Sequence, residues 1–541
     1  MNACPECGGE LFFDIKSQSL LCPYCSGKKA PGRFSDFGPA ADEATARSGK
    51  NDEISVTLYS CPQCGGSIYS TEQSINGFCS YCGSYVMLES RMAKMKYPKY
   101  VAPFRIDKEH CKQLYLDHVK RALLAPKELK DPEYLDRFRG IYISYWGYDV
   151  SLNGYLALEG ERPGYAGGTE KVRCKGWLHA VYTGAFFDAS SSFEDHFSEQ
   201  IAPFDHNALV EFTPAYLTGF YADLPDLDDS VYEDNAIFIA KERVLSSSRL
   251  QKAFPSVHFS EAQKELFRPT IDAHCSETYT TLFPVWFLSY RNKDRVAYAV
   301  INGQNGRMVS DLPVDRKKFC LLALLIALPL FGFLCLQPAI PPTALFLISE
   351  CLSLSSVFML TQMLKRIFVQ REKIYDKGYQ SKNRKLNYLY YLKETSDIRS
   401  IRQKGLALLP YLLVAAVMIF LPRINLVLAA LFNGFTLELT SILSIVIEIF
   451  LFRSSFLIAK IVEQQKVPLL AGIWITFAGT LYGTYLTLMT EAGAAQMLLC
   501  VCVILIGTLI SQMITLDQYN IMVTRPLPQL KRKGGADHAW D

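Results

Sequence analysis

Eight cysteines near the N-terminus are the residues of this sequence best suited to chemistry. The stretch CPECGGELFFDIKSQSLLCPYCSG, residues 4–27, contains two Cys-x-x-Cys pairs, and CPQCGGSIYSTEQSINGFCSYCGS, residues 61–84, repeats them at the same spacing. A tight Cys-x-x-Cys turn directs two thiolates at one point, and two such turns complete a tetrahedral Zn²⁺ site. We therefore predict two zinc ribbons with two zinc ions per chain, held by Cys4, Cys7, Cys22 and Cys25 and by Cys61, Cys64, Cys79 and Cys82.

Redox dithiols and disulfides are the alternatives for these cysteines. A thioredoxin-like motif has one Cys-x-x-Cys pair that opens a helix, whereas this chain has four pairs in two equally spaced sets. Gly8 and Gly65 follow the first pair of each set, where the chain must reverse direction with a positive φ. Each unit is too short for a core of its own, so zinc binding of about 10 to 16 kcal/mol would supply its folding free energy. A site closed by four thiolates maintains structure and performs no catalysis.

The charge of the two ribbons argues against binding to nucleic acid. Residues 1–30 carry equal numbers of basic and acidic side chains, and residues 58–90 carry Glu72 and Glu89 with no Lys or Arg. Phosphate binding requires a basic surface. Neutral and acidic ribbons favour contacts with protein over contacts with DNA.

Composition divides the chain into five regions. Its 541 residues, 50% of them hydrophobic, suffice for several domains, and long apolar runs begin only after residue 316. The expected regions are zinc ribbon 1 (1–30), a flexible linker rich in Ala, Gly and Ser (31–57), zinc ribbon 2 (58–96), a cytosolic domain (97–315) and a multi-pass membrane domain (316–541).

The region 97–315 is predicted to be an α+β domain with antiparallel sheets. Residues 107–124 place apolar side chains on one helical face. Residues 141–160 are expected to form two strands around a tight turn at Asn153 and Gly154, because this dipeptide is a strong hairpin signal. A similar pattern follows further along the chain, with a helix expected at 235–253 and Trp-containing strands at 281–308.

Stretches of about 20 apolar residues predict a C-terminal bundle of about six transmembrane helices. The expected spans lie near residues 319–337, 343–364, 406–422, 437–458, 467–490 and 494–516. Glu350 and Glu448 fall inside spans, where a carboxyl group either marks an ion path or is hydrogen-bonded to Ser or Thr neighbours.

Loop charge predicts the orientation of these spans. The stretch 365–404 contains twelve Lys and Arg residues, so it should remain in the cytosol, whereas the loops 337–342 and 490–496 contain none. The first residues lack the basic and apolar pattern of a signal peptide. We therefore expect a protein of the cell membrane with both termini in the cytoplasm, a reducing compartment that keeps thiolates available for zinc.

Two His-Cys neighbours are the remaining candidates for catalysis. His110 precedes Cys111 and His274 precedes Cys275, which resembles a base beside a nucleophile. Adjacent residues on a helix or strand point in different directions, and no oxyanion or Gly-rich phosphate loop accompanies them. We predict that the chain is not an enzyme.

The order of several motifs resembles a known family. CPECGG, CPQCGG, APFRI, GIYISYWGYD, TPAYLTGFYADL, LFPVWFLSY and NGQNGRM occur in the order found in bacterial double-zinc-ribbon (TFIIB-type zinc ribbon) membrane-attached proteins of Gram-positive genomes. Members are associated with genes for flotillin-like SPFH proteins, phage-shock-protein-A-like coiled coils and TPM-domain membrane proteins of the envelope-stress response. The resemblance covers about residues 1–315, and it implies zinc at the eight cysteines and partners of these kinds. Six spans are more than relatives of this family have.

These observations lead to one favoured function and one alternative. The favoured function is a non-enzymatic integral membrane scaffold or anchor, whose cytosolic zinc ribbons and α+β domain recruit protein partners such as flotillin-like or phage-shock-protein-A-like proteins. Two ribbons on a flexible linker would offer two contact points to an oligomeric partner. The alternative is a membrane-bound protein that binds nucleic acid and acts in transcription or replication, and a transporter ranks third.

Overall fold

The computed structural model describes the chain outside several segments, the longest of which is 378–443. The described residues are 4–31, 53–64, 66–70, 79, 81–84, 89–164, 167–190, 193–223, 225–260, 264, 266, 268–335, 342–371, 377, 444–453, 466–488 and 493–527.

A small three-stranded antiparallel sheet begins the described chain. Its strands follow the order β1 (Phe12–Asp14), β2 (Ser19–Leu21) and β3 (Lys28–Lys29). Leu20 and Phe13 are buried between this sheet and the body of the molecule. This unit corresponds to the predicted zinc ribbon 1.

A twelve-stranded sheet forms the centre of the molecule. Its main path is β10-β7-β12-β8-β11-β5-β4-β6, with β9 paired to β8 and with β13, β14 and β15 added beyond β12. Pairing is antiparallel except between β11 and β8 and between β12 and β7. The bounds are β4 (Glu53–Ser60), β5 (Ser67–Ser70), β6 (Glu89–Lys96), β7 (Tyr100–Val101), β8 (Arg139–Pro163), β9 (Thr169–Asp188), β10 (Val210–Glu211), β11 (Tyr221–Ala222), β12 (Asp272–Asn292), β13 (Arg295–Asn302), β14 (Met308–Ser310) and β15 (Arg525–Pro526).

Helices cover both faces of this sheet. The predicted helix at 107–124 is confirmed as α1, which Asp107 caps by accepting a hydrogen bond of 2.8 Å from the His110 backbone N–H. Helix α4 packs against β8, β9 and β12, with Ala236 and Ala240 fully buried. The bounds are α1 (Lys108–Arg121), α2 (Pro132–Leu135), α3 (Asp195–Ile201), α4 (Glu233–Leu245) and α5 (Ser248–Ala253), with short 3₁₀ turns η2 (Lys127–Lys130), η3 (His206–Ala208), η4 (Pro214–Leu217), η5 (Asp229–Tyr232) and η6 (Arg268–Thr270). The antiparallel sheet domain is thus as predicted.

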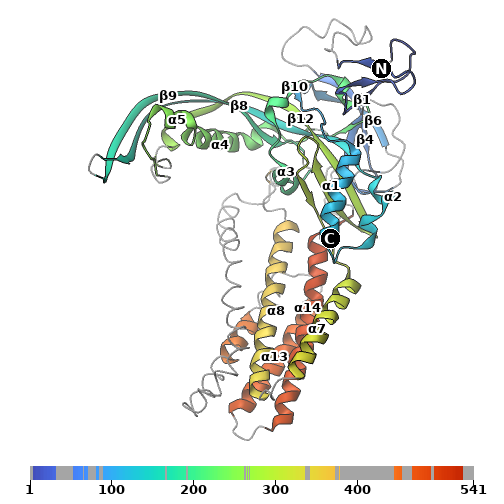
Figure 1. The fold of residues 1–541 in the computed structure, drawn as a ribbon, viewed down its shortest axis with the longest axis vertical. Coiled ribbons are helices and arrows are strands. Elements are labelled where there is room, and N and C mark those ends of the chain that lie inside the picture. Colours follow the sequence, from blue (N-terminus) through green and yellow to red (C-terminus); the bar gives the residue numbers. More distant parts are fainter. Residues whose placement is uncertain are drawn as a thin grey trace.

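Strands β8 and β9 form a long arm that extends sideways from the body, with α4 and α5 along one of its faces (Figure 1). The predicted turn at Asn153 and Gly154 is wrong, because β8 continues through both residues to Pro163. Gly154 pairs with Leu178 of β9, and a Cβ at Gly154 would lie 3.4 Å from the backbone of Ile271. Pairing on both sides therefore overrides the local turn preference of the dipeptide.

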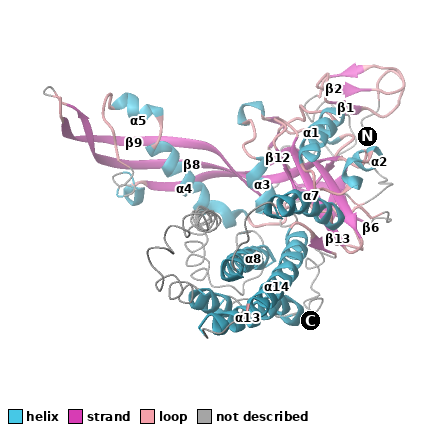
Figure 2. Ribbon diagram, turned by 60° about the horizontal axis from the view of Figure 1, so that its bottom comes forward, coloured by secondary structure: helices cyan, strands magenta, loops and turns pink. Residues whose placement is uncertain are grey.

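A bundle of apolar helices lies below the sheet domain, with its axis across the direction of the arm (Figure 1 and Figure 2). Its described helices are α7 (Arg316–Cys335), α8 (Pro342–Arg371), a helical stretch at 444–453, α13 (Lys466–Leu488) and α14 (Ala494–Met522). These positions match four predicted spans and part of a fifth. The span at 406–422 lies outside the described residues.

Only two helices in the described part of the chain are long and apolar enough to cross a membrane, at Leu345–Ile367 and Ala494–Met522. The prediction of about six transmembrane helices is corrected to these two candidates.

The carboxyl group of Glu350 lies inside the bundle. Glu350 is fully buried, and its Oε2 accepts a hydrogen bond of 2.7 Å from the Ser444 hydroxyl. This contact agrees with the prediction of a serine or threonine neighbour for one carboxyl oxygen, whereas Oε1 has no partner among the described residues.

Candidate metal centres and helix junction

Backbone hydrogen bonds shape each Cys-x-x-Cys turn in the same way. In ribbon 1, the Cys4 N–H donates to the Gly9 carbonyl at 2.7 Å and the Gly8 N–H donates to the Cys4 carbonyl at 2.8 Å. Gly8 has a φ of 73°, as the sequence predicts for the reversal, and Gly65 lies outside the described residues. At the fourth turn, the Cys79 N–H donates to the Ser84 carbonyl at 2.8 Å, in the same pattern. The repeated turns place the thiols of each unit around one point.

The structure brings the eight predicted ligands together as two tetrads. All four sulfurs of each set lie within 4.8 Å of one another. In ribbon 1, the sulfurs of Cys4 and Cys25 are 3.5 Å apart. In ribbon 2, those of Cys61 and Cys82 are 3.8 Å apart. A tetrahedron of sulfurs with Zn–S distances of about 2.3 Å has sulfur–sulfur distances of about 3.8 Å. Both tetrads therefore fit a metal ion held by four thiolates.

The two tetrads differ in their exposure to solvent. In ribbon 1, Cys4 and Cys22 are buried, whereas Cys7 and Cys25 are exposed. In ribbon 2 all four cysteines are buried. The neighbouring Tyr24 of ribbon 1 is 80% exposed. One side of the first site therefore faces solvent, and the second site lies inside the protein.

Ribbon 2 is part of the central sheet and not a separate module. Strand β4 pairs with β5 and β6, and β5 continues the sheet through Tyr69, which pairs with Ala222 of β11. The Tyr81 ring packs edge-on against Phe287 of β12 at 5.7 Å, and the Arg291 Nη1 donates to the Gln63 Oε1 at 3.0 Å. The predicted boundary at 97 between ribbon 2 and the α+β domain is therefore corrected, because one sheet crosses it.

The end of the predicted linker also belongs to this sheet. Strand β4 begins at Glu53, so residues 53–57 are not part of the linker; residues 32–52 lie outside the described residues. The alternation of Ile54, Val56 and Leu58 with polar residues is typical of a half-buried strand. This signal was available in the sequence.

Ribbon 1 packs on the body, and its Leu11, Phe13 and Leu20 belong to the same core as Phe104. The Gln18 Nε2 donates to the Phe104 carbonyl at 2.7 Å, and the Phe13 ring lies 5.1 Å from Tyr216. An exposed ion pair of 3.3 Å joins Lys16 to Asp107. Ribbon 1 therefore docks on the body and shares no strand with it.

Polar groups around the second tetrad stabilise thiolates. The Gly66 N–H donates to the Cys64 sulfur at 3.4 Å, and the Ser84 hydroxyl lies 3.0 Å from the Cys82 sulfur. Hydrogen bonds from Cys64 and Cys79 lower the pKa of Cys61, whereas hydrogen bonds within the tetrad and burial raise the pKa values of Cys64 and Cys79. A lowered thiol pKa favours metal binding, because the ligand is the thiolate.

The His-Cys neighbours do not form a catalytic pair. His110 is exposed on the surface of α1, whereas Cys111 is fully buried in the core beneath it. Burial raises the pKa of the Cys111 thiol. Cys275 also has its pKa raised by burial, to about 11. Neither thiol has the low pKa of a nucleophile.

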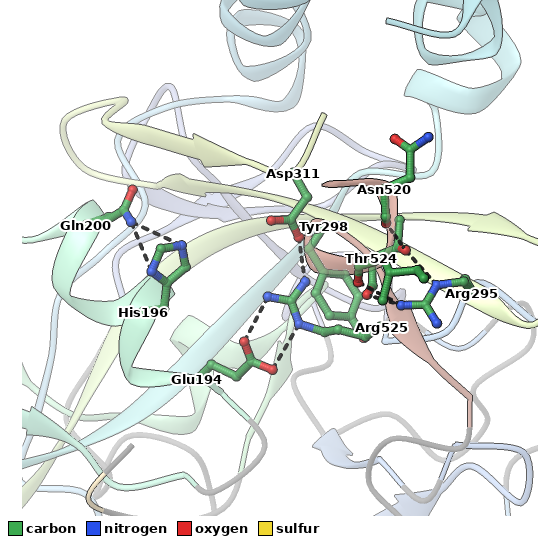
Figure 3. Close-up of polar contacts among 10 residues, drawn as sticks. Glu194, His196, Gln200, Arg295, Tyr298, Asp311, Asn520, Thr524 and Arg525 are labelled. Atoms are coloured by element: carbon green, nitrogen blue, oxygen red, sulfur yellow. Dashed lines mark hydrogen bonds and ion pairs between the residues drawn. The ribbon is translucent and has the colours of Figure 1, made fainter. Parts of the chain in front are cut away.

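A junction that the sequence did not reveal joins the last helix of the bundle to the sheet. After α14, the chain enters β15, where Arg525 pairs with Val296 of β13. The Arg525 side chain is 7% exposed and forms two hydrogen bonds with Glu194, of 2.9 and 2.8 Å, and one of 2.5 Å with Asp311 (Figure 3). Its guanidinium lies 5.1 Å from the centre of the Tyr298 ring. Burial alone would lower the pKa of Arg525, but both carboxylates raise it above its ordinary value.

The first helix of the bundle is tied to the same place. The Val314 N–H donates to the Asn520 Oδ1 at 2.8 Å, and the Asn520 Nδ2 donates back to the Val314 carbonyl at 3.0 Å. The Tyr519 hydroxyl donates to the Leu312 carbonyl at 3.2 Å. The start of α7 and the end of α14 are therefore held side by side at the sheet. No local pattern around these residues distinguishes them in the sequence.

Comparison with known proteins gives one distant similarity. A Bacillus subtilis (strain 168) protein described as "Uncharacterized protein YdjG" is 26% identical over 323 residues, which cover 58% of this chain and 90% of that protein. No family model and no solved structure matches the chain.

Proposed function

We propose that this chain is a non-enzymatic, membrane-anchored scaffold that recruits protein partners to the cytosolic face of the cell membrane through its sheet domain. The junction at Arg525 is the observation that carries this proposal, because it joins an apolar helix of membrane-spanning length directly to the central sheet. The first described helix of the bundle begins at that sheet and the last one ends there, as expected for an even number of crossings. Zinc sites of free thiolates also require a reducing compartment.

The arm offers the best recruitment surface among the described residues. Leu156, Leu158 and Leu178 face α4, and on the opposite face of β8 and β9 Trp177 is 74% exposed, Val181 is 65% exposed and Tyr155 is 47% exposed. The Tyr155 and Trp177 rings pack edge-on at 5.3 Å. Exposed aromatic side chains held rigidly on a sheet are typical of binding hot spots. The arm projects away from the body, so a large partner can reach this face.

The two ribbons have different roles in this proposal. Zinc is the metal we assign to both tetrads, since four thiolates are its typical structural ligands. Ribbon 2 stabilises the sheet domain, and ribbon 1 presents an additional accessible surface. The proposal that both ribbons act as equal contact points on a flexible linker is replaced by one accessible ribbon and the arm. Flotillin-like and phage-shock-protein-A-like proteins are the first partners to test.

Nucleic-acid binding remains the second candidate, because of one stripe of side chains. The exposed face of β9 carries Lys171, Arg173 and Lys175 beside Trp177, a combination that suits phosphates and stacked bases. Glu159 forms a 2.5 Å ion pair with Arg173 and reduces the positive charge of this face. Protein recruitment is therefore favoured.

The experiment that tests the function combines fractionation with co-purification. The full chain should stay in the membrane fraction after an alkaline wash, and cross-linking should capture a protein partner in cells. Trp177→Ala together with Tyr155→Ala should reduce that capture about tenfold or more, as the loss of hot-spot residues does. Leu123→Ala is the matched control, because Leu123 is 76% exposed on the body of the molecule.

Each outcome of this experiment discriminates between the candidates. Release by the alkaline wash would contradict membrane anchoring. Undiminished capture by the arm variant would contradict recruitment through the arm. Salt-sensitive binding of the wild type to single-stranded DNA, lost in the arm variant, would favour the nucleic-acid function.

A further inference from the structure

A large cavity lies where the bundle meets the sheet domain. Its volume is about 1240 Å³, and four parts of the chain line it: η2, the turn between β12 and β13, the segment that leads into α7, and the last turns of α14. The junction contacts of Asn520 and Arg295 form part of its wall. This cavity is unrelated to the metal centres and to the arm.

The cavity lies at the boundary between the polar surface of the sheet domain and the apolar surface of the helices. Lys317 lies at the start of α7, one helical turn before the exposed Leu321. Ile514 and Ile521 of α14 contribute apolar surface to its lining. If the apolar helices span the membrane as proposed above, this height corresponds to the headgroups of the inner leaflet.

Some charged groups of the cavity are already occupied by protein contacts. The Arg295 guanidinium donates to the carbonyls of Ile521 at 2.8 Å and Thr524 at 2.5 Å, at the C-terminal end of α14. Arg316 forms an ion pair of 2.5 Å with Asp517. These charged groups already have protein partners, so a ligand can pair only with the other charged side chains of the cavity.

Asp315 accepts a hydrogen bond of 2.8 Å from the Lys317 backbone N–H, and four other charged side chains line the cavity, two of each sign. Lys293 and Lys317 are exposed cations, and Glu128 and Asp294 are exposed carboxylates. Within the described residues, none of these four side chains makes an ion pair or hydrogen bond. A ligand that matches them needs an anionic group and a hydrogen-bonding cation within one molecule.

We propose that this cavity binds the headgroup of an aminophospholipid of the phosphoethanolamine type. The phosphate accepts hydrogen bonds from Lys293 and Lys317, and the primary ammonium donates to Glu128 and Asp294. Charge-assisted hydrogen bonds of this kind are the strong ones in proteins. The apolar wall of α14 accommodates the glycerol and the first part of the acyl chains. The inference rests on the proposed membrane location and adds a specific lipid to it.

Three lipids with identical acyl chains test this inference on the full chain in detergent micelles. Native mass spectrometry would measure the binding of phosphatidylethanolamine, phosphatidylcholine and phosphatidylglycerol. Phosphatidylcholine keeps the phosphate but has no N–H to donate, and phosphatidylglycerol has no cation. We expect phosphatidylethanolamine to bind about tenfold more tightly than either, since one charge-assisted hydrogen bond supplies that difference.

Variants assign the preference to this cavity. Glu128→Gln with Asp294→Asn should abolish the preference over phosphatidylcholine, and Lys293→Ala with Lys317→Ala should weaken all three lipids. Lys171→Ala with Lys175→Ala on the arm is the matched control, with the same loss of charge at another surface. Zinc content reports whether each variant is folded.

The outcomes separate this inference from the proposed function. Equal binding of phosphatidylethanolamine and phosphatidylcholine, or tighter binding of phosphatidylglycerol, would overturn the headgroup assignment while the chain still fractionates with membranes. An unchanged preference in the Glu128→Gln, Asp294→Asn variant would also overturn it. Release of the wild type by an alkaline wash would instead contradict the membrane location itself.

Discussion

The two ribbons share one cysteine pattern and have different surroundings. In ribbon 1 a separate three-stranded sheet supports the tetrad, and Cys7 and Cys25 reach solvent. In ribbon 2 the strands belong to the central sheet, and the tetrad lies in the same core as Phe287 and Tyr298. Cysteine spacing therefore determines which residues meet, whereas the structural role of a site depends on the residues packed around it.

This difference extends to the junction with the bundle. Tyr298 belongs to the core that surrounds the second tetrad, and its ring also faces the guanidinium of Arg525. Metal binding in ribbon 2 and the attachment of α14 therefore share one core. Ribbon 1 packs into a different core, in which Cys4 and Cys22 lie with Phe104, Tyr142 and Trp286.

Loss of the second metal site should have the largest effect. Cys79→Ser removes a buried ligand, and a structural zinc site contributes about 10 kcal/mol or more to folding. We expect one zinc per chain by elemental analysis and unfolding of the sheet domain at a much lower temperature. Cys7→Ser is the control. It should also lose one zinc, but the unfolding temperature of the sheet domain should change little. Equal changes in the two variants would contradict the difference between the ribbons.

Removal of the buried arginine should be next in size. Arg525→Met leaves Glu194 and Asp311 without their cation in a buried site, which destabilises a protein by about 3 to 5 kcal/mol. Denaturant unfolding of the purified full chain would measure the effect.

Arg173→Ala provides the comparison, because its ion pair with Glu159 is exposed and such pairs contribute about 1 kcal/mol or less. Arg525→Gln with Glu194→Gln should recover part of the loss. Equal effects of the Arg525 and Arg173 variants would show that the junction contributes little to stability.

Acidification should release the two metals at different rates. Thiolates bind zinc, so protons compete with the metal, and the stability due to zinc is present at high pH and lost as the pH falls. In the second tetrad the pKa of Cys61 is lowered and the pKa values of Cys64 and Cys79 are raised, so protons compete most strongly at Cys64 and Cys79. A coloured chelator should remove one zinc rapidly, from exposed ribbon 1, and the second slowly. The Cys7→Ser variant, which lacks the ribbon 1 metal, should show no fast phase of zinc removal. A fast phase that persists in this variant would refute the assignment.

The smallest effect is expected where ribbon 1 touches α1. Asp107 caps α1 and pairs with Lys16, and the hydrogen bond from the His110 N–H lowers its pKa. Asp107→Ala should cost about 1 kcal/mol, as the loss of an N-cap does. The contribution is present above the ordinary carboxyl pKa and disappears as the pH falls through the lowered one.

Lys16→Ala is the matched change for this cap. It removes the exposed ion pair and keeps the cap, so its effect on unfolding should be close to zero. An effect as large as that of Asp107→Ala would show that the docking of ribbon 1, and not the cap, carries the stability.

The metal ligands were predictable because they depend on short spacings along the chain. The same holds for α1, where the Asp107 cap precedes a helical apolar pattern. The integration of ribbon 2 was not predictable, since it depends on the pairing of Tyr69 with Ala222, residues distant in the sequence. Asn153 and Gly154 show the opposite error, because a strong local turn signal is overridden by neighbours that come from other strands.

The number of spans shows a further limit of sequence patterns. Apolar composition identified the positions of α7, α8, α13 and α14, but length and hydropathy single out two helices of the described chain. The role of Arg525 in the junction could not be predicted for another reason. An arginine after an apolar helix is common, and its partners Glu194 and Asp311 are distant in the sequence.

Strand β15 has a consequence for the order in which the protein is made. Residues 525–526 leave the ribosome after the whole bundle, yet they pair with β13, which was synthesised more than 200 residues earlier. Until then, the residues of β13 that receive β15 stay unpaired, and an open strand edge invites pairing with other chains. The sheet is therefore complete only after the last helix has been synthesised and positioned. A ribosome stalled before Arg525 would hold a sheet domain that lacks its final strand.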